Sequence, residues 1–175
     1  MSNLIVFDNA IQRAAYCAAL TTINQPHIVF WCQHQHLDHE PFSKLLSKVQ
    51  SYLRGELKSL SNLERFHEAF AEWRETLPAD DSLGYEIAEL CCASLYSAAE
   101  TLLDDECDDI ELIDGNIAAI YASMEGLTTD VDELQRYGRD IQQGLRDVLH
   151  DVSQRPVAKD YFLFVKECDV SLFGL

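Results

Sequence analysis

No lysine or arginine occurs between Glu75 and Glu133, although this stretch contains seventeen aspartates and glutamates. The rest of the chain carries thirteen acidic and thirteen basic residues, so the net charge of −17 arises entirely within this stretch. A field of one sign repels nucleic acid and anionic membrane surfaces, and it attracts cations or a basic protein surface. We therefore expect a basic protein as the partner, and no binding to nucleic acid or membranes.

The sequence also lacks the motifs of common enzyme classes. Its seven glycines form no Gly-x-Ser-x-Gly elbow, P-loop or dinucleotide-binding pattern. No apolar run approaches the roughly 18 residues of a membrane span, and the first ten residues lack the basic and apolar regions of an export signal. We assign no cofactor and no catalytic residue, favour a non-enzymatic protein over an enzyme, and expect a cytoplasmic location.

Cysteine-pair motifs are absent as well. The six cysteines include an adjacent pair, Cys91-Cys92, but no Cys-x-x-Cys, and four of the six fall within helix-like apolar patterns. A buried free cysteine behaves as a small hydrophobic residue. Since there is no export signal, we interpret all six as reduced thiols.

Apolar residues recur at helical spacing from end to end, which indicates an all-α fold. A chain of 175 residues that is 47% hydrophobic has the size and composition of a globular domain. We expect residues 1–175 to form a single-domain bundle of about seven or eight helices. The first is expected from Ala10 to about Thr22, separated by Asn24-Gln25-Pro26 from a second that runs from His27 to about His36.

The remaining helix boundaries are predicted from capping residues, prolines and glycines. On these grounds we expect helices to begin near Pro41, Ser61, Asp81 or Ser82, Asp105, Asp130 and Pro156, with one ending at Gly126. The tail from Asp169 to Leu175 carries Val170, Leu172 and Phe173, and we expect it to dock on the bundle.

The densest acidic segment is a candidate surface for the basic partner. Apolar positions at helical spacing continue through it, which places its acids on the solvated faces of core-forming helices rather than on a flexible tail. The candidate partner-binding residues are Asp104, Asp105, Glu106, Asp108, Asp109, Glu111 and Asp114.

Three less favoured patterns contain metal-ligand residue types. His36 and His39 share a helical face in the segment His34–Glu40, and imidazole suits zinc or iron. Glu64-x-x-His67, with Asp147-x-x-His150 as a loose partner, has the spacing of di-iron bundles.

The third pattern pairs Glu86-x-x-Glu89 with Glu106-x-x-Asp109. All-α nucleotide pyrophosphohydrolases hold magnesium with carboxylates on facing helices in a similar layout. Polar turns and solvated helix faces explain these residues equally well.

Several short segments, spread over nearly the whole chain, together carry a resemblance to a known family. They are Gln12–Leu20, Phe30–Gln33 with Asp38, Lys44–Leu53, Leu63–Ala69, Leu77–Asp81 with Gly84, Tyr85, Ala88 and Cys91, and the tail Ser171–Leu175. Together they resemble the YjaG-like bacterial proteins grouped as domain of unknown function 416, although Leu172 stands where that family has Asn. The resemblance implies an all-α, soluble, bacterial cytoplasmic protein. It implies no activity and no catalytic residues.

Three functions remain open at this point. The leading hypothesis is a protein-interaction module, for example an immunity or regulatory protein, whose acidic face binds a basic partner. The alternatives are a metal-dependent hydrolase or oxidoreductase, with magnesium or a di-iron centre, and a homodimeric scaffold.

Overall fold

The computed structural model describes residues 6–175. Within that part of the chain there are seven α-helices and no strand, which confirms the predicted all-α single-domain bundle. The expectation about an export signal rests partly on residues 1–5, which lie outside the described residues. The helices are α1 (Ala10–His34), α2 (Glu40–Leu53), α3 (Leu60–Glu75), α4 (Leu83–Leu103), α5 (Ile110–Met124), α6 (Val131–Leu149) and α7 (Lys159–Glu167).

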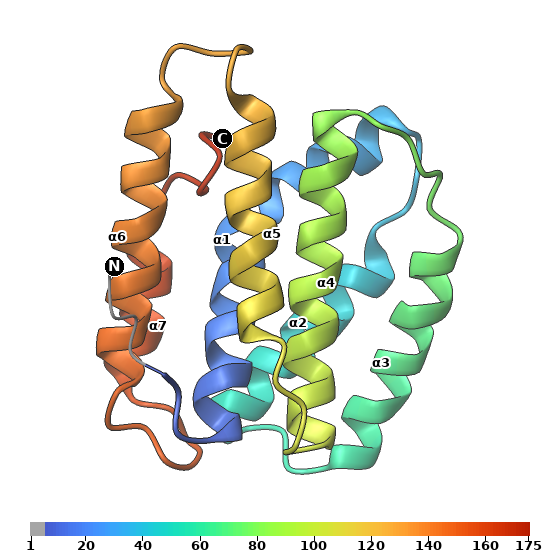
Figure 1. The fold of residues 1–175 in the computed structure, drawn as a ribbon. Helices are drawn as coiled ribbons and strands as arrows, with labels where there is room; N and C mark the ends of the chain where they lie inside the picture. The colour runs from blue at the N-terminus through green and yellow to red at the C-terminus, as the bar shows by residue number, and fades with distance from the viewer. Residues whose placement is uncertain (1–5) are drawn as a thin grey trace.

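Helix α1 is the central element of the bundle (Figure 1). It packs against α2, α4, α5, α6 and α7, and its pairing with α4 is the most extensive contact in the molecule. Small side chains on both helices allow their backbones to approach closely, and such close packing maximises dispersion contacts. The fully buried small residues include Ala14, Ala15, Ala18, Ala19 and Cys32 on α1, and Cys91, Cys92, Ala98 and Ala99 on α4.

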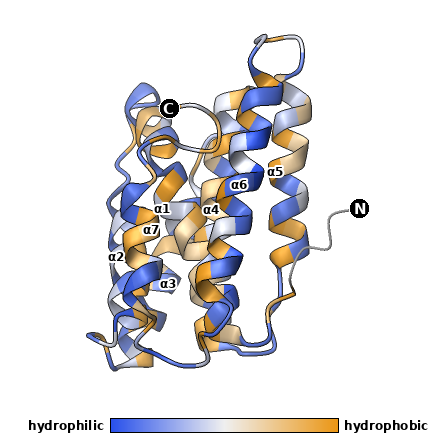
Figure 2. Ribbon diagram, turned by 90° about the vertical axis from the view of Figure 1, so that its left-hand side faces the viewer, coloured by the Kyte–Doolittle hydropathy of each residue, from blue (hydrophilic) through white to orange (hydrophobic). Residues whose placement is uncertain are grey.

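The outer helices are amphipathic. Helix α6 carries both hydrophobic and hydrophilic residues (Figure 2), with Ile141, Leu145 and Leu149 buried and Asp132 and Arg139 exposed. Burial of one apolar stripe against α1 and α7 stabilises such a helix more than its intrinsic propensity does. None of the described helices has the length and apolar character needed to cross a membrane.

The predicted break at Asn24-Gln25-Pro26 is wrong, because α1 continues through Pro26. A proline inside a helix costs about 3 kcal/mol, since it removes one hydrogen bond and crowds the preceding turn. Here Pro26 is exposed, whereas Ile23 and Ile28 on either side are buried. Asn24 is also fixed, because its Oδ1 accepts a hydrogen bond from Leu172 N at 3.1 Å. Tertiary packing on both sides of the proline therefore outweighs the local cost.

Three other predicted starts are displaced along the chain. Ser59, not Ser61, caps α3, because its Oγ accepts from Asn62 N at 3.2 Å. Helix α5 begins at Ile110 rather than near Asp105. Helix α7 begins at Lys159, after a cis peptide bond between Arg155 and Pro156. In contrast, Pro41 in α2, Ser82 before α4 and Gly126 after α5 stand where the sequence predicts them.

The C-terminal tail docks on the bundle, as predicted. Leu172 and Phe173 are buried. Tyr121 Oη on α5 donates to Leu172 O at 2.6 Å, and Ser171 Oγ lies 2.5 Å from His27 Nε2 on α1. The tail thereby ties α1 to α5.

Candidate functional site

The connection between α4 and α5 contains five acidic residues, and we call residues 104–109 the acidic loop. It lies at the same end of the bundle as the start of α1 (Figure 1). Arg13 on α1 holds this loop by its backbone: Nη2 donates to Asp105 O at 2.8 Å and Nε donates to Cys107 O at 3.2 Å. Because the guanidinium binds carbonyl groups, it fixes the loop without neutralising the loop carboxylates at short range.

Two aspartates shape the loop from within. Asp104 Oδ1 accepts from Glu106 N at 3.1 Å, and Asp108 Oδ1 accepts from Ile110 N at 3.3 Å. An aspartate that bonds the amide two residues ahead favours a turn over a helix. These turns are the physical reason why α5 begins later than expected, and why the acids of this segment lie mostly in a loop rather than on a helix face.

Five of the seven candidate acids remain available at the surface. They are exposed, and none forms an ion pair with any residue in the range 6–175. We call this group the acidic surface; it consists of Asp104, Asp105, Glu106, Asp108 and Glu111. Its charges face solvent from a backbone that Arg13 and the two turns hold in place.

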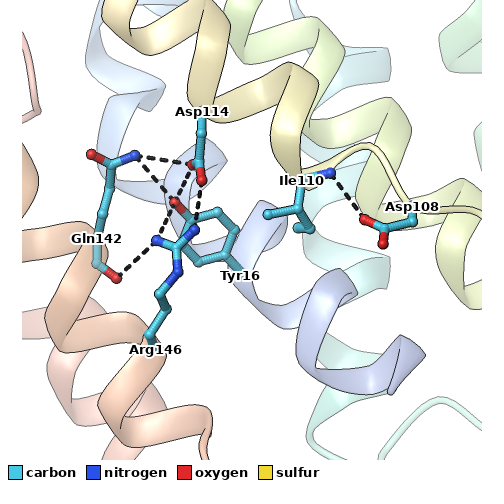
Figure 3. A network of polar contacts seen from close by, with 6 residues as sticks. All are labelled: Tyr16, Asp108, Ile110, Asp114, Gln142 and Arg146. Carbon is cyan, nitrogen blue, oxygen red and sulfur yellow. Dashed lines mark hydrogen bonds and ion pairs between the residues drawn. The ribbon is translucent and has the colours of Figure 1, made fainter. Parts of the chain in front are cut away.

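The other two candidate acids have partners inside the protein. Asp109 Oδ2 accepts from Ser97 Oγ at 2.9 Å. Asp114 is the centre of a network that joins three helices (Figure 3). Its Oδ1 accepts from Tyr16 Oη at 2.5 Å and Gln142 Nε2 at 3.0 Å, and its Oδ2 accepts from Arg146 Nη2 at 2.5 Å. Asp109 and Asp114 therefore contribute to the packing of the helices and are not part of the free acidic surface.

The Asp114 network holds one ion pair, with Arg146, and two neutral donors, Tyr16 and Gln142. Burial, followed by the nearby Asp114 charge, raises the pKa of Tyr16 far above its ordinary value, so the phenol keeps its proton and donates. Burial alone lowers the pKa of Arg146, but the Asp114 charge and the hydrogen bonds to Asp114 and Tyr16 outweigh it, so this pKa ends above its usual value. The network therefore acts as a structural connection between α1, α5 and α6.

A pocket of about 620 Å³ is lined by residues of both the acidic surface and this network. Asp108, Glu111 and Asp114 contribute carboxylates to its lining, and Arg13 and Arg146 contribute guanidinium groups. Phe7 and Ile110 add apolar surface. Such a mixed pocket suits a long side chain with an apolar stem and a charged head, which lysine and arginine both have.

Two of the three histidine candidates, His39 and His67, contact neighbouring polar side chains. His36 stands in the left-handed region with φ 58°, and His39 lies at the start of α2 with Nδ1 3.0 Å from Ser43 Oγ. His67 is buried with Nε2 2.9 Å from Glu100 Oε2, whereas Glu64 is exposed. In the loosely matching motif Asp147-x-x-His150, the Asp147 carboxylate accepts a hydrogen bond from Gln143 Nε2 at 2.9 Å.

The carboxylates of the magnesium pattern lie in different surroundings. Glu89 pairs with Arg74 of α3, and Glu86 is exposed at the start of α4. Glu106 belongs to the acidic loop, and Asp109 bonds Ser97. Over residues 6–175, no three or more His, Cys, Asp or Glu residues are grouped so that they could hold a metal ion.

Sequence reasoning missed Arg13 and the partners of Asp114. Arg146 is 2% exposed, and it follows Gln142 by four residues on the edge of the buried stripe of α6. A buried arginine needs a carboxylate partner. Two polar residues one turn apart beside an apolar stripe were therefore the available signal, although that signal does not identify Asp114 as the partner.

Comparison with known proteins adds no relative to this picture. No protein-family model, curated protein or solved structure matches the chain.

Proposed function

We propose that this protein is a non-enzymatic interaction module that binds a basic face of another protein through its acidic surface. The observation that carries the proposal is the state of the five carboxylates. They are exposed and without ion pairs within residues 6–175; four lie on the loop that Arg13 holds by its backbone, and Glu111 lies in the first turn of α5. Fixed charges of this kind lower the entropic cost of binding compared with a flexible acidic tail.

The size of the charge supports recognition by electrostatic steering. A net charge of −17, concentrated between Glu75 and Glu133, creates a long-range field that raises the association rate of a basic partner. The same field opposes contact with nucleic acid and with anionic membranes. At roughly 0.15 M salt the field is screened over about 8 Å, so binding through this surface weakens as salt rises.

The kind of protein proposed is an immunity or regulatory factor in the cytoplasm. An immunity protein that neutralises a basic nuclease is one specific version, and a gene for a basic toxin immediately upstream would support it. We also propose membership of the YjaG-like group on the strength of the sequence segments that resemble it. That membership brings no activity with it.

The test removes charge while keeping shape. In the loop variant, Asp104, Asp105 and Asp108 become Asn and Glu106 becomes Gln, so the side-chain oxygens that form the turns are retained. The matched control removes four exposed acids at the opposite end of α5. It changes Glu125 and Glu133 to Gln and Asp130 and Asp132 to Asn. Both variants carry the same net charge.

The immobilised proteins are incubated with extract of the producing cells at low salt and then washed with rising salt. We expect the wild type and the control to retain a basic protein that salt releases, and we expect the loop variant to lose it. Equal retention by the loop variant would rule out the acidic surface as the binding site. A wild type that retains no salt-released protein would count against the proposal as a whole.

A further inference from the structure

A second pocket, of about 850 Å³, lies between the end of α2 and the face of α7. We call it the α2–α7 groove. Its lining includes Gln50 and Arg54 from α2, and Lys159, Phe162, Leu163 and Lys166 from α7. Small-molecule sites in proteins have volumes of roughly 300–1,000 Å³ and mostly apolar walls. The groove has the size and surface character of such a site.

The apolar part of the groove is open to a ligand. Leu163 is 53% exposed, and Phe162 is half-buried with the guanidinium carbon of Arg54 5.0 Å from its ring centre. That contact holds the Arg54 charge beside the aromatic surface. An apolar chain lying along Phe162 and Leu163 would lose contact with water while its end remained close to a cation.

The charged groups that line the groove are positive, whereas the protein as a whole is strongly negative. Arg54, Lys159 and Lys166 line it, and no aspartate or glutamate does. Within the described chain, these three cations form no ion pair. On a protein of net charge −17, three unpaired cations around an apolar groove indicate a ligand with an anionic group.

The groove also contains an amide with an incomplete set of hydrogen bonds. Gln50 is 8% exposed, and its Nε2 donates to Thr22 Oγ1 at 3.1 Å. Its Oε1 is buried and has no hydrogen-bond partner among residues 6–175. An unsatisfied buried acceptor is costly, and native structures usually supply it with a partner. Because this oxygen can only accept a hydrogen bond, an anionic group would not satisfy it, and the choice of ligand rests on the cations and the apolar surface.

The dimensions favour a small molecule over a protein as the occupant. A stable protein interface covers about 800 Å² of each partner. Helix α7 has nine residues, which corresponds to a length of roughly 13 Å. Among the large apolar residues that line the groove, Leu163 is the exposed one. The apolar surface thus lies inside the groove, where a narrow chain reaches it and a broad protein face does not.

We propose that the α2–α7 groove binds a long-chain carboxylate in its monomeric, non-micellar form. The alkyl chain packs on Phe162 and Leu163, and the carboxylate lies between Arg54, Lys159 and Lys166. This site is separate from the acidic surface and does not depend on the function proposed for it. Each methylene that is fully buried strengthens binding about fourfold, so the affinity rises with chain length until the groove is filled.

The experiment titrates the full-length protein with octanoate, decanoate and dodecanoate below the concentrations at which they form micelles. Dodecanol provides the same chain without charge, and acetate provides the charge without the chain. The variant Lys159→Gln/Lys166→Gln removes two groove cations but leaves Arg54, which packs on Phe162. The matched control is Lys44→Gln/Lys58→Gln, which removes two exposed cations outside the groove.

We expect affinity to increase from octanoate to dodecanoate, with shifts in the NMR signals of α7 amides. We expect the groove variant to bind dodecanoate about tenfold more weakly and the control to match the wild type. Circular dichroism confirms that each variant is folded. The proposal is overturned if dodecanol binds as tightly as dodecanoate, if both variants bind equally, or if the shifted amides lie outside the groove.

Discussion

Arg146 Nη2 donates to Asp114 Oδ2 across 2.5 Å, and the two side chains are 2% and 19% exposed. This bond joins α6 to α5, and Tyr16 of α1 bonds to both residues. Removing one partner of a buried ion pair leaves a charge without compensation, which costs more than the pair contributes while intact. Asp114 is therefore required for stability, although the sequence presents it as one more member of an acidic patch.

Replacement of Asp114 by Ala is expected to lower the free energy of unfolding by about 2–3 kcal/mol, toward the low end for buried pairs because Asp114 keeps some contact with water. The matched control is Glu111→Ala, one turn earlier on the exposed side of α5, with an expected change within about 0.5 kcal/mol. Urea denaturation followed by circular dichroism measures both. Similar losses for the two variants would contradict the role assigned to Asp114.

Replacement of Arg13 by Met is expected to loosen the acidic loop without changing its carboxylates. The variant loses two hydrogen bonds to loop carbonyls, so the amides of residues 105–110 should exchange with deuterium about tenfold faster. The control is Arg139→Met, which removes an exposed arginine of α6. If loop exchange is unchanged in the Arg13 variant, then the loop does not depend on this residue for its geometry.

The helices themselves were predictable because local spacing encodes them. Phe42, Leu45, Leu46, Val49 and Leu53 fall on one side of α2, and all five are buried. Ser82 and Gly126 mark helix ends through properties of the residue itself, a side-chain cap in one case and a positive φ of 86° in the other. Such signals require no knowledge of distant parts of the chain.

Features that depend on distant contacts were not predictable from the sequence. Pro26 favours a helix break locally, but packing around Ile23 and Ile28 keeps α1 intact. The pairing of Arg146 with Asp114 joins residues 32 positions apart, and nothing in the local pattern selects that acid from its neighbours. Two of the seven candidate acids, Asp109 and Asp114, bond to buried residues, and the other five are exposed. The spacing of the acids in the sequence does not distinguish these two groups.

Native thiol reactivity should divide the six cysteines into two groups. All are free, with Cys107 and Cys168 partly exposed and the other four buried. Burial raises the pKa of Cys91 to about 12, and it raises the pKa of Cys17 further. Because the thiolate is the reactive form, we expect two equivalents to react with a disulfide reagent in native protein and four only after unfolding.

The pH dependence of the accessible pair has a defined sign. Burial raises the pKa of both Cys107 and Cys168 above the ordinary thiol value. At neutral pH both are therefore mostly protonated, and their reaction rate should rise nearly tenfold for each pH unit until the pKa is reached. A rate that is constant between pH 7 and 8, or six equivalents reacting in the native state, would contradict this assignment.

Two glycines should respond to alanine in opposite directions. A Cβ at Gly138 of α6 would lie 2.1 Å from Tyr121 Oη, whereas a Cβ at Gly115 of α5 has nothing within 4 Å. Gly138→Ala is expected to cost about 1–3 kcal/mol through overpacking. Gly115→Ala is expected to add up to about 1 kcal/mol, because alanine is the better helix former. Thermal denaturation of the two single variants measures both signs.

The cost at Gly138 arises because Tyr121 cannot turn away freely. Its ring packs on Phe173 with centroids 5.2 Å apart, and its hydroxyl donates to Leu172 O. Gly138→Ala should therefore release the C-terminal tail, with faster deuterium exchange at the Leu172 amide. Adding Tyr121→Phe removes the closest clashing atom, so the double variant should be more stable than the sum of the single changes predicts. If the stability changes of the two single variants simply add in the double variant, the strain does not arise at the contact between residue 138 and Tyr121.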